Sequence, residues 1–262
     1  LGGTLSVTKL MELGFNGIFF VIIQMTITIV GAMYIGKKLG FSQNFRMLMA
    51  SGNAVCGSSA IAATAPVIDA SDEDKGIAIT VVNITGIFLM FLLPVLSRYL
   101  YNHEAVRTSA MIGGTLQSVG QVVASGEMVN EHVKELATIF KIVRVILLVG
   151  VIFVLGHIKQ KTNHEIVEEE ISDVKKGKIK IPWYVIGFFI TCALFTLNII
   201  SPEVSYLFKA ISNKLEIIAL AAIGLRVNLR ELIKQGKSVS LYALFVGSLQ
   251  VVTAIALISI FL

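Results

Sequence analysis

The feature that most constrains this chain is a series of long apolar runs. Residues 18–36, 76–96, 182–200 and 238–262 each have the length and apolarity of a membrane-crossing helix, which needs about 20 residues. A further helix is predicted over residues 130–158. Of all residues, 55% are hydrophobic and only 15% are charged, whereas about a quarter are charged in a soluble domain. The sequence therefore predicts an all-α polytopic membrane protein, with one transmembrane domain over residues 1–262.

Residues 47–68 are also long enough to span a bilayer, but they are much less apolar. The segment carries two glycines and several small polar side chains at membrane depth: Gly52, Asn53, Cys56, Gly57, Ser58 and Ser59. Non-helical backbone at that depth survives only against protein or a water-filled cavity. Transporters place such broken helices around their substrates. We predict a helix broken at Gly57 and Ser58; the alternative is an unbroken small-residue helix packed closely on its neighbours.

A second weakly apolar segment covers residues 108–126. It contains Gln117, Ser118 and Gln121, and the two glutamines share a helix face because they are four residues apart. These amides are candidates for contact with a substrate. The alternative is that they only join neighbouring helices, and the same alternative applies to Asn83.

The predicted helix over 130–158 carries Lys141 and Arg144 within its apolar part. They lie three residues apart on one helix face, and a long apolar run follows Arg144. Burying a cation in a membrane costs about 2.5–3.5 kcal/mol on insertion scales, so such residues usually have a function. We predict that the pair attracts an anion in a water-accessible cavity. The alternative is that both side chains extend to the membrane interface.

The distribution of basic residues predicts the orientation. If every segment, including 47–68 and 108–126, crosses the membrane, fifteen of the 22 Lys and Arg residues lie on one side and five on the other. The positive-inside rule then makes residues 159–180 a cytoplasmic loop and residues 69–75 external. A faint echo between residues 2–14 and 224–236, predicted on opposite sides, is typical of inverted repeats.

Other functional classes find little support in the sequence. The two cysteines lie in apolar segments and have no metal-ligand spacing, and the four histidines fall at loops or span ends. No nucleophile and base pair or phosphate-binding glycine motif is visible. The net charge of +5 resides mostly in short loops between spans and does not indicate nucleic-acid binding. We expect no enzyme activity, no cofactor and no metal site.

Four motifs together resemble a known family: GNAVCGSSAIAATAP, GGTLQSVGQVVASG, FKIVRVILL and AAIGLRVNLRELIKQG. They are similar to the YeiH family of bacterial inner-membrane proteins, to which sulfate export is ascribed, and the resemblance runs along essentially the whole chain. Family members carry about two further N-terminal helices, so we expect this chain to be a fragment. Many relatives have His-Glu where this sequence has Gln117-Ser118, whereas Lys141 and Arg144 match the family pattern.

The resemblance implies an inverted-repeat transporter fold with two discontinuous helices that cross at mid-membrane, here 47–68 and 215–229. It relates the family to bile-acid symporters and cation–proton antiporters, and it implies a secondary transporter that exports a small inorganic anion. Alternatives are an organic-anion symporter coupled to sodium or protons and a non-transport membrane protein. Expected partners are the anion, the lipid bilayer, a coupling ion and, as an open alternative, a second copy of the chain. The candidate substrate-binding residues are Asn53, Cys56, Gly57, Ser58, Ser59, Gln117, Gln121, Lys141, Arg144 and Asn228.

Overall fold

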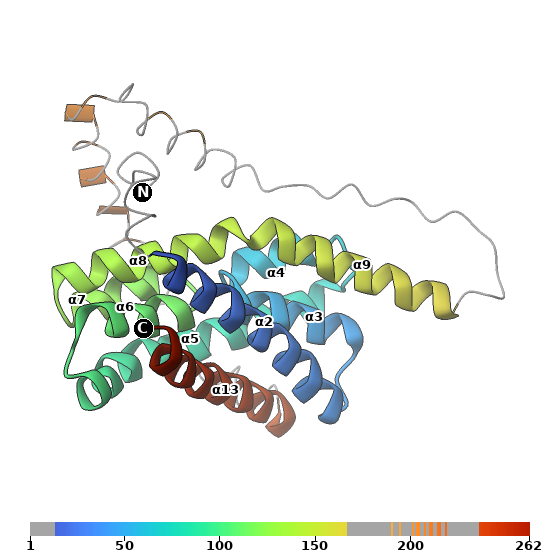
Figure 1. The fold of residues 1–262 in the computed structure, drawn as a ribbon. Coiled ribbons are helices and arrows are strands. Elements are labelled where there is room, and N and C mark those ends of the chain that lie inside the picture. The colour runs from blue at the N-terminus through green and yellow to red at the C-terminus, as the bar shows by residue number, and fades with distance from the viewer. Residues whose placement is uncertain are drawn as a thin grey trace.

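The computed structural model describes residues 14–166 and 236–262, together with scattered residues between 190 and 218. Every regular element in the described part is a helix, as the sequence predicts (Figure 1). The helices are α2 (Gly14–Lys38), α3 (Gln43–Ala54), α4 (Ser58–Thr64), α5 (Asp72–Tyr101), α6 (Ala105–Thr115), α7 (Val119–Glu127), α8 (Glu131–Ile146), α9 (Leu148–Ile166) and α13 (Lys237–Phe261).

Four helical stretches of the described residues are long and apolar enough to cross a membrane: α2, α5, α8 with α9, and α13. The predicted spans 18–36, 76–96 and 238–262 are therefore confirmed as helices, whereas 182–200 and 215–229 lie largely outside the described residues. Ser71 caps α5 as its hydroxyl oxygen accepts a hydrogen bond from the Asp74 N–H at 3.1 Å. The predicted helix over 130–158 is interrupted at Leu147. It continues to Ile166, into the predicted loop 159–180.

The segment predicted to be broken at Gly57 forms a helical hairpin, hairpin 1, made of α3 and α4. The two halves of hairpin 1 run antiparallel, because the Asn44 side chain donates to the Asp69 carbonyl at 3.2 Å and Gly52 faces the Ile61 side chain. The chain reverses through Val55–Gly57, where Gly57 has φ +65° and ψ −125°. L-residues rarely adopt this conformation, so glycine allows the turn at low cost. The predicted break is confirmed, but the chain turns back on itself there.

Residues 105–127 form a second hairpin, hairpin 2, made of α6 and α7. Helix α6 runs parallel to α8, because the Ser109 hydroxyl donates to the Val133 carbonyl at 3.2 Å and Gly113 faces Ala137. Helix α7 runs antiparallel to α8, because its end at Gly126 faces Lys134. The two halves of hairpin 2 are therefore antiparallel to each other, with the reversal at Leu116–Ser118.

The prediction that residues 47–68 and 108–126 each cross the membrane was wrong. Hairpin 1 enters and leaves at the Lys38 end of the bundle, where α2 finishes; hairpin 2 does so at the Tyr101 end, where α5 finishes (Figure 1). The loop 69–75 therefore lies at the same end as residues 37–46 and the start of 159–180, not at the opposite one. The Lys38 end carries Lys37, Lys38, Arg46, Lys75, Lys159 and Lys237, and the Tyr101 end carries Arg98, Arg107 and Lys134.

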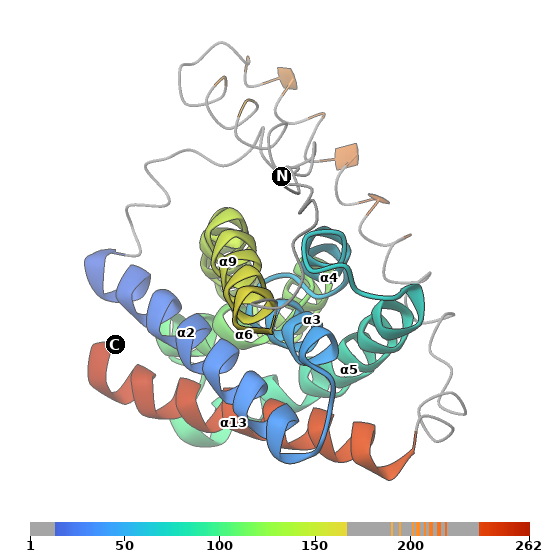
Figure 2. The same cartoon turned by 90° about the vertical axis from the view of Figure 1, so that its right-hand side faces the viewer.

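The described helices thus contain two similar units that follow one another in the chain and run in opposite directions across the bundle. The first is hairpin 1 followed by α5; the second is hairpin 2 followed by α8 and α9. This inverted pair differs from the predicted echo of 2–14 with 224–236, which falls largely outside the described residues. Helices α2 and α13 lie side by side against the units (Figure 2), and the Tyr242 hydroxyl of α13 donates to the Ala32 carbonyl of α2 at 2.7 Å.

Candidate functional site

The tips of the two hairpins meet inside the bundle. Helix α3 has 12 residues and α6 has 11, which makes them about 18 and 17 Å long at 1.5 Å per residue. Together these lengths roughly match the hydrocarbon thickness of about 30 Å, so hairpins that enter from opposite ends reach each other near the middle. At the meeting point, the Gln117 amide of hairpin 2 donates to the Asn53 side-chain oxygen of hairpin 1 at 3.2 Å.

Arg144 joins the two tips from α8. Its Nε donates to the Ala54 carbonyl at 2.9 Å and one Nη donates to the Asn53 carbonyl at 2.7 Å, both at the end of α3. Its other Nη donates to the carbonyls of Gly113 at 3.2 Å and Leu116 at 2.7 Å, at the end of α6. The side chain is 1% exposed. Four of the five guanidinium N–H groups therefore bind backbone carbonyls of two different helix ends.

Lys141 makes the same kind of bridge one turn earlier on α8. Its ammonium donates to the carbonyls of Val55, in the tip of hairpin 1, and Leu116, in the tip of hairpin 2. The side chain is fully buried. The alternative that Lys141 and Arg144 extend to the membrane interface is therefore wrong. The structure also differs from the predicted water-accessible cavity, because both side chains are enclosed and engaged by the protein.

The electrostatics of helix ends explain why cations lie here. The last carbonyls of a helix have no intrahelical partner, and the C-terminus carries a partial charge of about −0.5. Helices α3 and α6 both end at the tips, so two such charges face Lys141 and Arg144. Helices α4 and α7 both begin there and bring the opposite partial charge. The cation pair neutralises only the C-terminal ends.

A cluster of buried amides lies beside the cations. Gln250 of α13 donates to the Asn53 carbonyl at 2.9 Å, and its side-chain oxygen accepts from the Gln117 amide at 3.2 Å. Gln24 of α2 donates to the Gln250 carbonyl at 2.8 Å. The Asn53 carbonyl is thus shared by Gln250 and Arg144. The amides tie α2 and α13 to both hairpin tips, so the predicted residues Asn53 and Gln117 are brought together.

Helix α5 closes another side of the tips. The Gln121 side-chain oxygen accepts from the Ser118 N–H at 3.1 Å, which caps α7, and its amide donates to the Asn83 carbonyl of α5 at 3.3 Å. Gly86 permits this approach, because a Cβ there would clash with the side chains of Gln121 and Gln117. A Cβ on Gly57 would lie 3.4 Å from the Gln117 Cβ and 3.9 Å from the Asn83 side-chain oxygen. The predicted residues Gly57, Gln117 and Gln121 therefore share one surface with α5.

At both tips, one helix end is more enclosed than the other. The helix ends that the cations bind are buried, whereas the starts of α4 and α7 are partly accessible. The partly exposed polar residues at these starts are Cys56, Ser58, Ser59 and Ser118. Nine of the ten predicted site residues thus lie at or beside the hairpin tips, and Asn228 is outside the described residues. We refer to this region as the tip site.

Sequence reasoning missed Gln24 and Gln250. Each is the lone amide within an otherwise apolar stretch of a predicted span, and a buried amide requires a partner. That requirement was the available signal, but it does not identify the partner.

Comparisons with known proteins identify the family. The sequence profile of a family described as conserved hypothetical protein 698 matches residues 1–243. The chain is 50% identical over 263 residues to a UPF0324 membrane protein of Lactiplantibacillus plantarum, covering 100% of this chain and 78% of that protein. It is 48% identical over 264 residues to a UPF0324 membrane protein of Clostridium perfringens, covering 100% and 77%.

A more distant relative carries the name that the sequence motifs indicate. The UPF0324 inner membrane protein YeiH of Salmonella typhi is 30% identical over 247 residues, covering 93% of this chain and 68% of that protein. No solved structure matches the chain significantly. With four apolar helices of membrane-spanning length among its described residues, this multi-pass membrane protein belongs to the UPF0324 family, which includes YeiH.

Proposed function

We propose that this protein is a secondary transporter that carries a small inorganic anion, sulfate or a related sulfur oxyanion, through the tip site. The observation that carries the proposal is an excess of positive charge at the centre of the bundle. Lys141 and Arg144 are buried there, and no Asp or Glu is buried among the residues that the structure describes.

The net charge at the tip site follows from these two side chains and the four helix ends beside them. The two side chains contribute +2 if both are protonated. The C-terminal ends of α3 and α6 contribute about −0.5 each, and the N-terminal ends of α4 and α7 return about +0.5 each. The sum is close to +2, in a region where charge is poorly solvated. An anion of one or two charges would balance it, whereas a cation would be repelled.

The arrangement also suggests which groups contact the anion. Carbonyl oxygens already engage Arg144, so we assign it and Lys141 to positioning the tips and setting the local field. The direct donors would be the partly exposed Ser58, Ser59 and Ser118 hydroxyls with backbone N–H groups at the start of α7, a common anion-binding arrangement. This differs from the sequence-based prediction, in which Arg144 itself contacts the anion.

Transport, rather than anion binding alone, is supported by the opposed hairpins. Each hairpin separates the tip site from one end of the bundle, so movement at either hairpin would open the site to that end. Broken helices at mid-membrane within units of opposite direction are the usual architecture of alternating access. The resemblance to a family to which sulfate export is ascribed points the same way.

Two measurements test the proposal. First, sulfate, sulfite and thiosulfate are compared with chloride and with methanesulfonate, an organic anion, for their effect on the melting temperature of the purified protein. A ligand of the folded state stabilises by about 2.7 kcal/mol at 100 times its Kd. Second, radiolabelled sulfate uptake is followed in proteoliposomes. Stabilisation and flux with an inorganic oxyanion are expected. A response to organic anions alone supports the symporter alternative, and no response to any anion contradicts transport of anions.

A further inference from the structure

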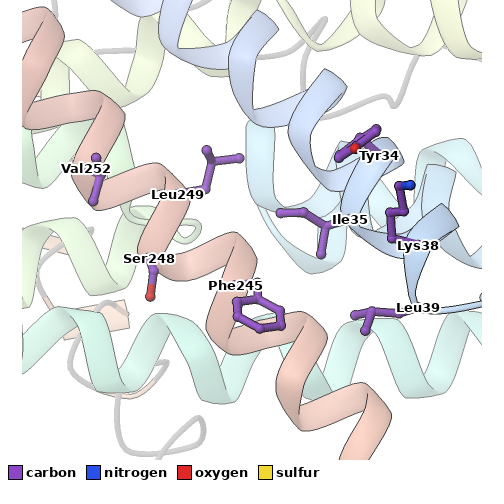
Figure 3. Close-up of a pocket in the computed structure, with 8 residues that line it drawn as sticks. All are labelled: Tyr34, Ile35, Lys38, Leu39, Phe245, Ser248, Leu249 and Val252. Carbon is purple, nitrogen blue, oxygen red and sulfur yellow. The ribbon is translucent and has the colours of Figure 1, made fainter.

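A groove on the outside of the bundle, away from the tip site, has the features of a lipid site. It runs between α2 and α13, has a volume of about 470 Å³, and is shown in Figure 3. The residues that line it are Tyr34, Ile35, Lys38 and Leu39 of α2 and Phe245, Ser248, Leu249 and Val252 of α13. The volume lies within the range of about 300–1,000 Å³ that is typical of ligand pockets.

The walls of the groove are apolar and face outward. Val252 is 63% exposed and Tyr34 is 60% exposed, so in a membrane these walls contact hydrocarbon. Helices α2 and α13 approach closely where Gly31 faces Leu249, which is itself a lining residue of the groove. The furrow beside this contact runs from Val252 and Leu249 toward Leu39 and Lys38. An acyl chain is the apolar molecule that a bilayer supplies to such a furrow.

The positive charge of Lys38, at one end of the groove, favours a lipid with an anionic headgroup. The Lys38 ammonium lies 5.7 Å from the centroid of the Tyr34 ring, at the last turn of α2. None of the described lining residues is acidic. Lys37, Arg46 and Lys237 are at the same end of the bundle, which the positive-inside rule makes cytoplasmic. Anionic lipids attract basic residues to that leaflet.

We propose that this groove binds one acyl chain of an anionic phospholipid, whose phosphate contacts Lys38. The purified full chain is titrated with phosphatidylglycerol and, separately, with phosphatidylcholine, and retained lipid is counted by native mass spectrometry. Phosphatidylglycerol is expected to bind more tightly. Lys38→Ala should reduce its affinity about fivefold, the effect of one lysine near a membrane surface.

Matched variants distinguish lipid binding in the groove from nonspecific attraction of anionic lipid to the basic end of the bundle. Lys37→Ala removes an equal charge that does not line the groove, so it should leave the affinity unchanged. Ser248→Trp fills the groove at an exposed position and should abolish retention, whereas Leu244→Trp, exposed on the same helix outside the groove, should not. Equal effects of Lys37→Ala and Lys38→Ala, equal binding of both lipids, or full retention in Ser248→Trp would each overturn the proposal. So would loss of a dimer in Ser248→Trp, because a second copy would then occupy the groove.

Discussion

Removing the Arg144 guanidinium should separate the two hairpin tips. In Arg144→Gln, four hydrogen bonds of 2.7–3.2 Å disappear. The Asn53 carbonyl keeps Gln250 as a donor, and the Leu116 carbonyl keeps Lys141. The carbonyls of Ala54 and Gly113 lose the bonds that Arg144 gives them. An orphaned buried polar group costs about 1–3 kcal/mol, so the two carbonyls together cost about 2–6 kcal/mol.

This free energy is measurable as a loss of thermal stability. One kcal/mol corresponds to about 2–4 °C for a domain of 150–250 residues, so the melting temperature should fall by at least about 4 °C. Arg107→Gln is the matched control, because Arg107 is exposed and pairs with Glu104 at the surface. The melt is followed in detergent by intrinsic fluorescence, with and without sulfate.

Arg144→Lys distinguishes bridging from charge. An ammonium keeps the positive charge but has three donors on one atom, so it cannot span the four carbonyls as the planar guanidinium does. We expect Arg144→Lys to lose stability but keep more anion affinity than Arg144→Gln, because only the lysine variant retains the positive charge beside the tips. If Arg144→Gln melts at the same temperature as Arg107→Gln, the carbonyl network does not hold the tips together and the reasoning is refuted.

Two further predictions concern the hairpins. Gly57→Leu should reduce anion binding and cost about 1–3 kcal/mol, because it strains φ +65° and brings a side chain against Gln117. Gly40→Leu strains φ +81° in open space, so equal loss of binding in both variants would contradict a specific role for the hairpin 1 tip. In a background without native cysteines, Glu73→Cys should be labelled from the cytoplasmic face and Asn102→Cys from the outside. Labelling of Glu73→Cys from the outside would contradict a re-entrant hairpin 1, because residues 47–68 would then cross the membrane.

The sequence predicts the helices well because each signal is local. Apolar runs of sufficient length mark the spans, and Ser71 before an acidic turn marks the start of α5. The break at Gly57 follows from a glycine among small polar residues. The second break, at Leu116–Ser118, also had a local signal. Ser118 followed three residues later by Gln121 is the pattern of a helix N-cap, and its position inside a weakly apolar segment indicates that a new helix begins there.

The direction of the chain after each break could not be predicted in this way. A broken helix that continues and one that turns back have the same composition and the same capping residues. Reversal depends on contacts between distant residues, such as Asn44 with Asp69 and Ser109 with Val133. The positive-inside count did not detect the error. Few basic residues lie at the ends of the hairpins. The same end of the bundle therefore has the excess of Lys and Arg whether the two segments cross the membrane or turn back.

The two opposed units differ in the feature that matters for function. Lys141 and Arg144 follow the tip of hairpin 2 on α8, whereas Asn83 and Gly86 occupy the similar place after hairpin 1 on α5. Both pairs are three residues apart and both face the tips. The α8 pair neutralises helix C-termini with charge. On α5 both residues are neutral: the Asn83 carbonyl accepts from Gln121, and Gly86 lets the Gln117 and Gln121 side chains approach. The positive field thus originates on the α8 side of the tip site, whereas the partly exposed polar residues lie at the starts of α4 and α7. For the proposed anion transport, this separation would supply attraction without a direct ion pair that would hold the anion too tightly to release.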